Sequence, residues 1–311
     1  MKKKLLLFSL IFLFFGLNIQ AKSELFIVLK IDNEIITNQD IKQEIKYLIA
    51  INNQLETINS KEIEKYAKQS LIKEKIKEKE LLKYFELNQE NEFLENYMKD
   101  FYKKMKLDNK EQFKEYLTAY DLTIEHVRKK FEIETVWNEL IYTKYKDQVN
   151  IDIESIKKKL KRDLDNKQLE IKSFELSEIL YQTVNKSETK EKYEKIFASI
   201  NDIGFNNTAN IFSTSDSSKF GGKIGWVNER QLSKNILSKI KDLKIGEISD
   251  PIIIPSGTII LKIEDLKKEK ADYNFEDELK KIITFEKNRQ FNQFSSIYYN
   301  KIKFNSKINE S

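Results

Sequence analysis

Glycine and proline are distributed very unevenly along this chain, and that distribution constrains its fold more than any other feature. Residues 61–148 contain neither of them. Every glycine after residue 21 lies between Gly204 and Gly257, and both prolines, Pro251 and Pro255, lie in the same part of the chain. Glycine and proline interrupt helices and support turns. The chain is therefore predicted to combine a long helical region with a separate part of mixed α and β structure.

The N-terminal region begins with the pattern of a hairpin and continues as helices. An apolar, β-branched run from Leu25 to Ile31 is followed by a turn signal at residues 32–34. Thr37 and Asp40 then have the spacing of a helix capping box. Four stretches with apolar residues at helical spacing follow, and they predict a helix bundle.

The second half of the chain changes its pattern twice. Residues 151–170 are charged and predict a helical connector, whereas residues 174–182 predict a strand and residues 189–200 a helix. After residue 267 the helical pattern returns, and residues 298–304 are expected to form a closing strand. The apolar face of the returning helix is expected to pack on the N-terminal helices. The predicted fold class is therefore α+β, with a discontinuous helical domain and one inserted α+β domain.

The first residues have the three-part layout of a secretory signal peptide. Lys2, Lys3 and Lys4 precede an apolar run over residues 5–17, and Ala21 offers a small residue for cleavage, so residues 1–21 are predicted to be the signal. The apolar run is shorter than the roughly 20 residues of a spanning helix. Cleavage is expected to leave no stable membrane span. Retention as a signal anchor is the alternative, because Ile19 fits the cleavage pattern poorly.

Composition excludes several classes of function. Loss of the three lysines in the signal lowers the net charge from +5 to about +2, which gives no footprint for nucleic-acid binding. The chain has no cysteine, so it has no thiol nucleophile and no zinc–thiolate site. The chain has a single histidine, His126, and this scarcity argues against a Ser-His-Asp triad or a His-rich metal site. His126 is expected to be a structural residue. No metal and no cofactor is expected.

Several segments of the chain, in the matching order, resemble known families. The parvulin prolyl isomerases have a signature S-x-D-x-x-S-x-x-G-G-D-L-G-W, which residues 213–226 resemble with STSDSSKFGGKIGW. Residues 176–180 (LSEIL), 244–251 (KIGEISDP) and 256–263 (SGTIILKI) resemble three further segments of that family. Residues 28–41 (VLKIDNEIITNQDI) are similar to the opening segment of SurA-type periplasmic chaperones.

The resemblance implies a division into domains and a function. It implies a SurA-like helical chaperone domain at residues 22–150 plus 268–311, the helical connector at residues 151–170 and a parvulin-like domain at residues 171–267. It also implies a periplasmic chaperone that binds unfolded polypeptides, outer-membrane β-barrel precursors above all. It fixes no oligomeric state.

The resemblance also locates an isomerase site that departs from the family at its three polar positions. Glu178 and Ile259 stand where the family has two histidines, and Ser215 stands where it has Asp or Cys. Leu232 and Ile236 fall where it has the apolar residues of the proline pocket. Rotation of an X-Pro bond needs a stabilised twisted amide and no nucleophile. Because the three polar positions of the family's site are changed here, we expect weak or absent isomerase activity. An active isomerase that uses Glu178 and Ser215 in altered roles is the alternative.

Aromatic residues of the helical domain are candidates for contacts with a client polypeptide, as the resemblance implies. The candidates are Phe93, Tyr97, Phe101, Tyr116 and Trp137. Ordinary packing in the helical core is the alternative for each of them.

Overall fold

The structure is a computed structural model that describes residues 24–89, 91–165, 170–182, 186–270 and 274–310. The predicted signal peptide lies outside the described residues. No helix in the described part of the chain has the length and apolar character needed to cross a membrane.

The N-terminal half is a hairpin followed by helices. Its elements are β1 (Ile27–Ile31), β2 (Glu34–Thr37), α1 (Asn38–Ile51), η1 (Asn53–Thr57), α2 (Ser60–Leu81), α3 (Glu92–Lys104), α4 (Lys110–Thr118), α5 (Ile124–Tyr145) and η2 (Lys146–Gln148). The predicted hairpin and capping box are confirmed. The Thr37 hydroxyl accepts a hydrogen bond from the backbone N–H of Asp40, and the Asp40 carboxylate accepts one from the backbone N–H of Thr37.

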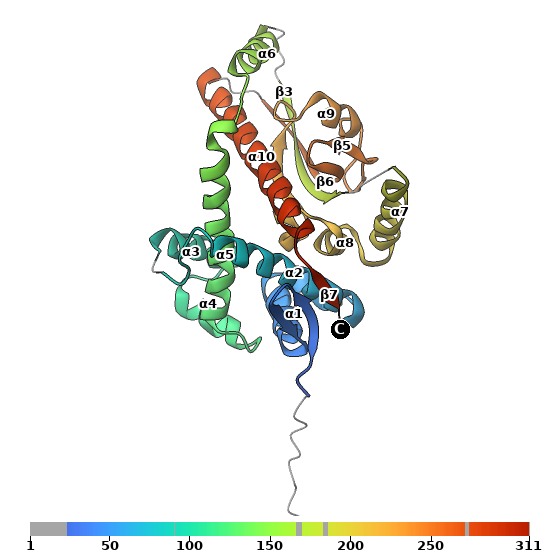
Figure 1. The fold of residues 1–311 in the computed structure, drawn as a ribbon. Helices are drawn as coiled ribbons and strands as arrows, with labels where there is room; N and C mark the ends of the chain where they lie inside the picture. Colours follow the sequence, from blue (N-terminus) through green and yellow to red (C-terminus); the bar gives the residue numbers. More distant parts are fainter. Residues whose placement is uncertain (1–23, 90, 166–169, 183–185, 271–273, 311) are drawn as a thin grey trace, which may run out of the picture.

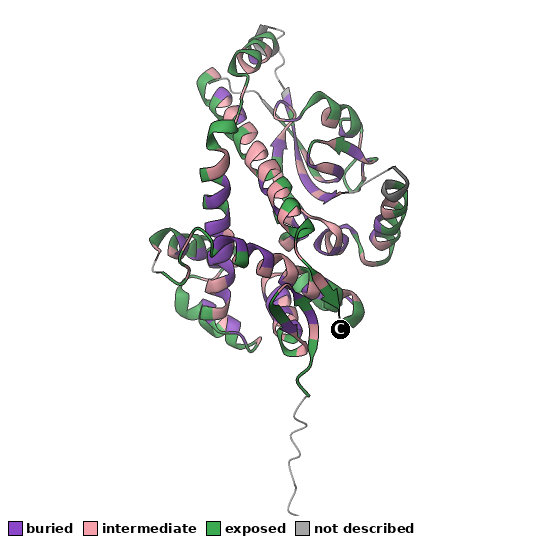
Figure 2. Ribbon diagram, in the orientation of Figure 1, coloured by how far each residue is buried: buried purple, intermediate pink, exposed green. Residues whose placement is uncertain are grey.

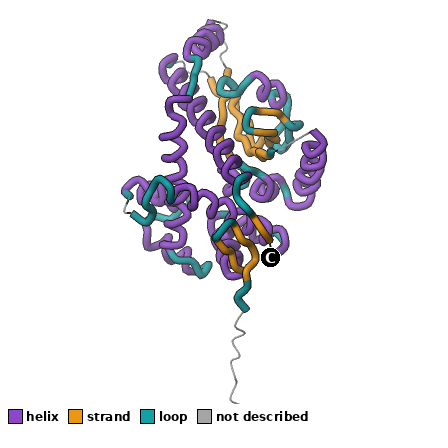
Figure 3. Tube along the Cα trace, in the orientation of Figure 1, coloured by secondary structure: helices purple, strands orange, loops and turns teal. Residues whose placement is uncertain are grey.

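The remainder of the chain forms an α+β unit and then a long helix. Its elements are α6 (Ile153–Asp165), β3 (Glu170–Tyr181), α7 (Lys186–Ile203), α8 (Phe205–Phe212), η3 (Asp216–Phe220), β4 (Lys223–Asn228), α9 (Lys234–Ile240), β5 (Ile252–Ile254), β6 (Gly257–Lys270), α10 (Phe275–Phe304) and β7 (Ile308–Glu310). The fold class is α+β, as predicted. Helices and the two separate groups of strands are seen in Figure 3.

The strands form two small sheets. The four strands of the inserted unit pair in the order β4-β3-β6-β5, and every pairing is antiparallel. The second sheet has the order β2-β1-β7, so a strand from each end of the described chain lies beside the other. The four-stranded sheet begins at Glu170 and ends at Lys270. It therefore extends slightly past residues 171–267, the predicted bounds of the inserted domain.

Helix α10 connects the two parts of the molecule. It packs on α5, α2 and α6 and runs between α5 and the four-stranded sheet (Figure 1). Tyr299 of α10 is buried in the same apolar core as α1, α2 and α5. Helices from both ends of the chain therefore share one core, and much of α5 is buried in it (Figure 2).

The strand predicted at residues 298–304 is wrong, because α10 continues as a helix through Phe304. Phe291, Phe294, Tyr298 and Ile302 all pack against the helical core at intervals of three or four residues. That spacing places them on one face of a helix. Packing of this face against the helical core stabilises the helix over the strand that was predicted. The closing strand is β7, which lies further along the chain.

Candidate functional site

A large cavity lies between the sheet of the inserted unit and the helical part of the molecule, with a volume of about 780 Å³. This volume is within the range of ligand-binding sites in proteins. Alternate residues of β3 point to one face of the sheet, and Leu176, Glu178 and Leu180 line the cavity from there. Residues of α6 and α10 form the opposite wall, among them Ile156, Leu160, Phe285, Arg289, Asn292 and Tyr299.

The floor of the cavity is aliphatic. Ile259 is buried on β6, where it pairs with Leu180 of β3 and with Ile252 of β5. Leu232 is buried and Ile236 is half-buried against the same apolar cluster. An apolar side chain or a proline ring that entered this floor would lose contact with water, which is favourable in proportion to the area buried.

One side of the cavity carries a carboxyl group held by two hydroxyls. The Ser215 hydroxyl donates a hydrogen bond of 2.5 Å to Glu178 Oε1, and the Ser217 hydroxyl donates one of 2.9 Å to the same atom. Both bonds from the described residues end on Oε1, so Oε2 is the oxygen that remains for a bound group. Burial raises the pKa of Glu178, although the bonds from Ser215 and Ser217 oppose this shift.

This arrangement defines what the site can do chemically. The protonated form of Glu178 would donate a hydrogen bond to a carbonyl oxygen, and the aliphatic floor would hold an apolar side chain. The imidazole of His126 lies elsewhere, at the start of α5, with its ring centre 6.2 Å from that of Tyr47. The site therefore suits binding and desolvation of a polypeptide segment, without a pair of histidines.

All five residues predicted for the isomerase-like site line this one cavity. They are Glu178, Ser215, Leu232, Ile236 and Ile259. Their proximity is a feature of the structure, whereas their roles stay predictions.

The aromatic residues predicted to face clients lie in different environments. Phe93 is 66% exposed on α3, and Tyr97 is exposed one turn further along the same helix. Phe101 and Tyr116 are half-buried against the helical core, where the Tyr116 hydroxyl donates to the carbonyl of Ala50 at 2.7 Å. Contact of these four residues with a client stays a prediction.

The assignment of Trp137 to a client surface is wrong. Its side chain is 0% exposed within the helical core. The indole N–H donates a hydrogen bond of 2.9 Å to the hydroxyl of Ser295 on α10. A buried tryptophan usually finds such a partner for its N–H. Because α10 covers Trp137, this residue is part of the core that joins the two ends of the chain.

Sequence reasoning did not identify the wall that α10 contributes, nor the charged residues Asp216 and Lys219 of η3. Asp216 lies inside the segment that resembles the parvulin signature, but its partners are on α2, far away in the sequence. No spacing rule connects such distant positions.

Among the residues that the structure describes, no three His, Asp or Glu side chains converge as metal ligands.

The comparisons with known proteins define the class of the inserted unit. Residues 174–265 match the PPIC-type PPIASE domain of the Rotamase family. This match contains β4, β5, η3 and most of β3 and β6. The inserted unit is therefore similar to a PpiC-type rotamase domain, and it is called the rotamase domain below. The cavity described above lies against it.

Two curated proteins are similar to part of the chain. The chain is 24% identical over 163 residues to the protein named Chaperone SurA of Pseudomonas putida, a match that covers 50% of the chain and 38% of the relative. It is 29% identical over 171 residues to the Foldase protein PrsA of Geobacillus kaustophilus, covering 54% of the chain and 57% of the relative. The matches thus span about two fifths to three fifths of these relatives.

One solved structure resembles the chain over most of its length. It is described as one of two structurally related SurA-like chaperones of Campylobacter jejuni. The sequence identity is 15% and the TM-score is 0.36, with 92% of this chain and 98% of the other covered. Over about half of its length, the chain is thus similar to proteins named as SurA chaperones and PrsA foldases.

Proposed function

We propose that this protein is a chaperone of exported proteins that binds unfolded polypeptides, and that its rotamase domain has weak or no isomerase activity. One observation supports both halves of the proposal. The cavity of about 780 Å³ has an aliphatic floor and a carboxyl group, Glu178, held by two serines. By sequence resemblance, Glu178 stands where parvulins have a histidine. The similarity to chaperones named SurA and PrsA supports the same class of function.

Aggregation of an unfolded β-barrel protein tests the chaperone function. The purified chain is expected to suppress the light scattering of such a client at near-stoichiometric amounts. Outer-membrane precursors are the proposed clients, so suppression is expected to be stronger for a β-barrel protein than for a chemically denatured soluble enzyme. Unchanged aggregation of both clients at an excess of the chain would contradict the proposal.

The isomerase is the second candidate function, favoured by the aliphatic floor and by the placing of Glu178 and Ser215 beside it. Turnover of a proline tetrapeptide measures this activity directly. Our proposal predicts a rate close to the uncatalysed one. If the rate is instead that of an intact parvulin, Glu178→Ala and Ser215→Ala should lower it.

Export to the periplasm is proposed from the predicted signal peptide and from the similarity to SurA-type chaperones. Mass spectrometry of the N-terminus of the protein recovered from cells tests it. A chain that begins at Lys22 is expected after cleavage. An N-terminus that retains residues 1–21 would indicate the anchored alternative.

A further inference from the structure

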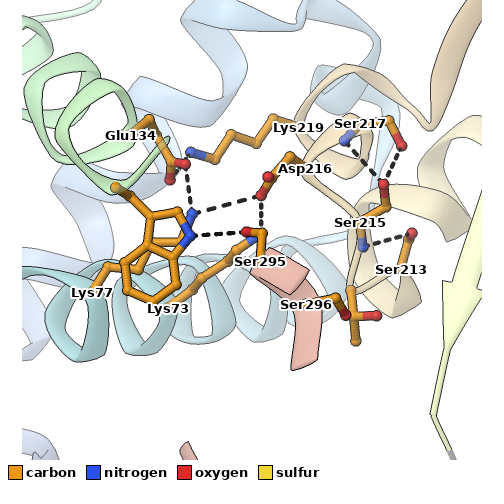
Figure 4. Close-up of polar contacts among 12 residues, drawn as sticks. Lys73, Lys77, Glu134, Ser213, Ser215, Asp216, Ser217, Lys219, Ser295 and Ser296 are labelled. Atoms are coloured by element: carbon orange, nitrogen blue, oxygen red, sulfur yellow. Dashed lines mark hydrogen bonds and ion pairs between the residues drawn. The ribbon is translucent and has the colours of Figure 1, made fainter. Parts of the chain in front are cut away.

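Element η3 of the rotamase domain extends its charged side chains into the helical domain. Asp216 Oδ1 lies 2.8 Å from Lys73 Nζ and 3.6 Å from Lys77 Nζ, both on α2. Lys219 Nζ lies 2.6 Å from Glu134 Oε1 on α5, and Lys77 Nζ lies 2.6 Å from Glu134 Oε2. Charges of opposite sign therefore alternate in one network across the boundary between the domains (Figure 4). We call these five residues the interdomain ion cluster.

The centre of the interdomain ion cluster is shielded from water, whereas Asp216 at its edge is 44% exposed. The side chain of Lys77 is 1% exposed, and those of Glu134 and Lys219 are 21% exposed. Burial alone would raise the pKa of Glu134, but Lys219 and Lys77 lower it to about 2. Removal of one partner from a buried pair leaves a poorly solvated charge, which is strongly destabilising.

The same short segment also builds the polar side of the cavity. Ser215 and Ser217 flank Asp216 and donate their hydroxyl protons to Glu178. Gly222 follows η3, and its carbonyl accepts a hydrogen bond of 2.7 Å from the backbone N–H of Glu178. A Cβ atom at Gly222, whose φ is +78°, would lie 2.2 Å from the Glu178 carbonyl oxygen. Gly222 therefore attaches the loop of residues 213–222 to β3, and the charges of Asp216 and Lys219 attach it to α2 and α5.

We propose that Lys219 and Glu134 are positioning residues for polypeptide binding, because their ion pair fixes the loop whose serines hold Glu178 in the cavity. The inference rests on the proposed function, in which this cavity binds polypeptide. Neither Lys219 nor Glu134 lines the cavity, whereas their cluster partners Lys73, Lys77 and Asp216 do. Either residue therefore acts on a bound peptide through the loop or through these partners. An ion pair outside the cavity thereby sets the affinity of the cavity for peptide.

Reciprocity follows from this linkage. If the interdomain ion cluster favours the loop conformation that binds peptide, bound peptide must favour the interdomain contact by the same free energy. The segment over residues 213–222 is then expected to gain protection from hydrogen exchange when peptide binds, and α2 around Lys73 and Lys77 is expected to gain it too.

The test uses the full chain and a fluorescein-labelled peptide with a single Leu-Pro step. Lys219→Met removes the charge and keeps much of the apolar stem. Lys239→Met is the matched control, because Lys239 pairs with Asp250 at 3.5 Å on the surface of the same domain and does not line the cavity. Fluorescence anisotropy is expected to show peptide binding weakened about tenfold by Lys219→Met, which is about 1.4 kcal/mol. Lys239→Met is expected to retain the affinity of the unmodified chain.

A double-mutant cycle separates positioning from a general loss of structure. Ser215→Ala should weaken binding by itself, and the effects of Lys219→Met and Ser215→Ala should be less than additive, since both act on the same loop. Glu134→Gln provides a milder change from the helical side and should weaken binding in the same direction. Thermal unfolding of each variant shows that the measured chain is folded.

The outcomes distinguish this proposal from the proposed function. If the unmodified chain binds no peptide, the proposed function fails at this site. Hydrogen exchange then still tests the linkage, because Lys219→Met should raise the exchange of residues 213–222 and Lys239→Met should not. If the unmodified chain binds peptide and Lys219→Met binds it equally well, or the two substitutions are additive, the positioning role is overturned.

Discussion

At the scale of single residues, Glu178 shows how an environment changes a side chain's chemistry. It lies on a strand whose neighbouring cavity-facing residues are aliphatic, and two serine hydroxyls are its hydrogen-bond partners. Burial disfavours its ionised form more than these hydrogen bonds favour it, so its pKa is raised. A carboxyl group in such a place can stay neutral at a pH at which an exposed glutamate is charged.

A pH dependence of stability follows from the raised pKa of Glu178. Above the ordinary value of 4.5, the unfolded chain releases this proton more readily than the folded protein does. Glu178 therefore destabilises the fold increasingly as pH rises from 4.5 to its folded pKa. Glu178→Gln is expected to unfold at a higher temperature than the unmodified protein at pH 8, and the difference should vanish near pH 4.

Thermal melts across this pH range measure the effect of Glu178→Gln. Glu175→Gln, on the same strand but outside the cavity lining, is the matched control. A gain in melting temperature that does not change with pH would show that the ionisation of Glu178 is not its cause.

Exposure separates core aromatics from those available to clients. Trp137→Ala is expected to lower the free energy of unfolding by about 3–5 kcal/mol, because it leaves a cavity and an unpaired hydroxyl on Ser295. Phe93→Ala should change it by about 0.5 kcal/mol or less, since the side chain is exposed. Denaturant titrations give both values. Suppression of aggregation should respond to Phe93→Ala at temperatures where the variant stays folded, and no response would remove Phe93 from the client surface.

At the scale of elements, local sequence decides where most helices begin. Thr37, Asn59, Asn91, Asn109, Thr123 and Asn274 all precede helices and accept hydrogen bonds from backbone N–H groups of the first turn. These side chains satisfy donors that a helix leaves unpaired at its start. The starts of these six helices are therefore set by the residue that precedes each of them.

Removal of one cap tests this control of helix α1. Thr37→Ala removes the hydroxyl that accepts from Asp40 and is expected to lower the free energy of unfolding by about 1 kcal/mol. Thr118→Ala, an exposed threonine near the end of α4 that donates to the carbonyl of Lys114, should have little effect. Urea unfolding measures both variants. Equal destabilisation by the two would show that the cap contributes nothing specific.

At the scale of the whole molecule, the two ends of the chain meet twice. Helix α10 packs into the core formed by α1, α2 and α5, and β7 pairs with β1. The backbone N–H of Lys307 also donates to Asp32 Oδ1 at 2.9 Å in the turn after β1. The rotamase domain is consequently an insertion, and its boundary with the helical domain carries the interdomain ion cluster.

The two tryptophans allow unfolding of the two domains to be followed separately. Trp137 lies in the helical core, and Trp226 lies on β4 of the rotamase domain. Tyr299→Ala on α10 is expected to lower the stability reported by Trp137 by about 3 kcal/mol, because Tyr299 belongs to the helical core. The free energy of unfolding reported by Trp226 should fall by less. Each transition is measured in a background where the other tryptophan is phenylalanine, and no shift at Trp137 would contradict the shared core.

Much of the local structure was predictable from the sequence. The hairpin at residues 27–37, its capping box and the helical character of residues 61–148 follow from short-range spacing and from the absence of glycine and proline. Resemblance to a family also gave five candidate residues for an isomerase-like site, and their roles stay predictions. Their presence around one cavity is what the structure adds.

Other features were decided by the tertiary structure alone. The burial of Trp137, the helical state of residues 298–304 and the pairing of Asp216 with Lys73 depend on contacts between positions far apart in the chain. Turns, caps and helical periodicity are set by residues within about one helical turn of each other, so a sequence determines them directly. Which apolar face meets which, and which buried charge finds a partner, depends on how complete elements pack. That is why the sequence predicted the elements and the inserted domain, whereas the interdomain ion cluster that holds the cavity's loop emerged only from the fold.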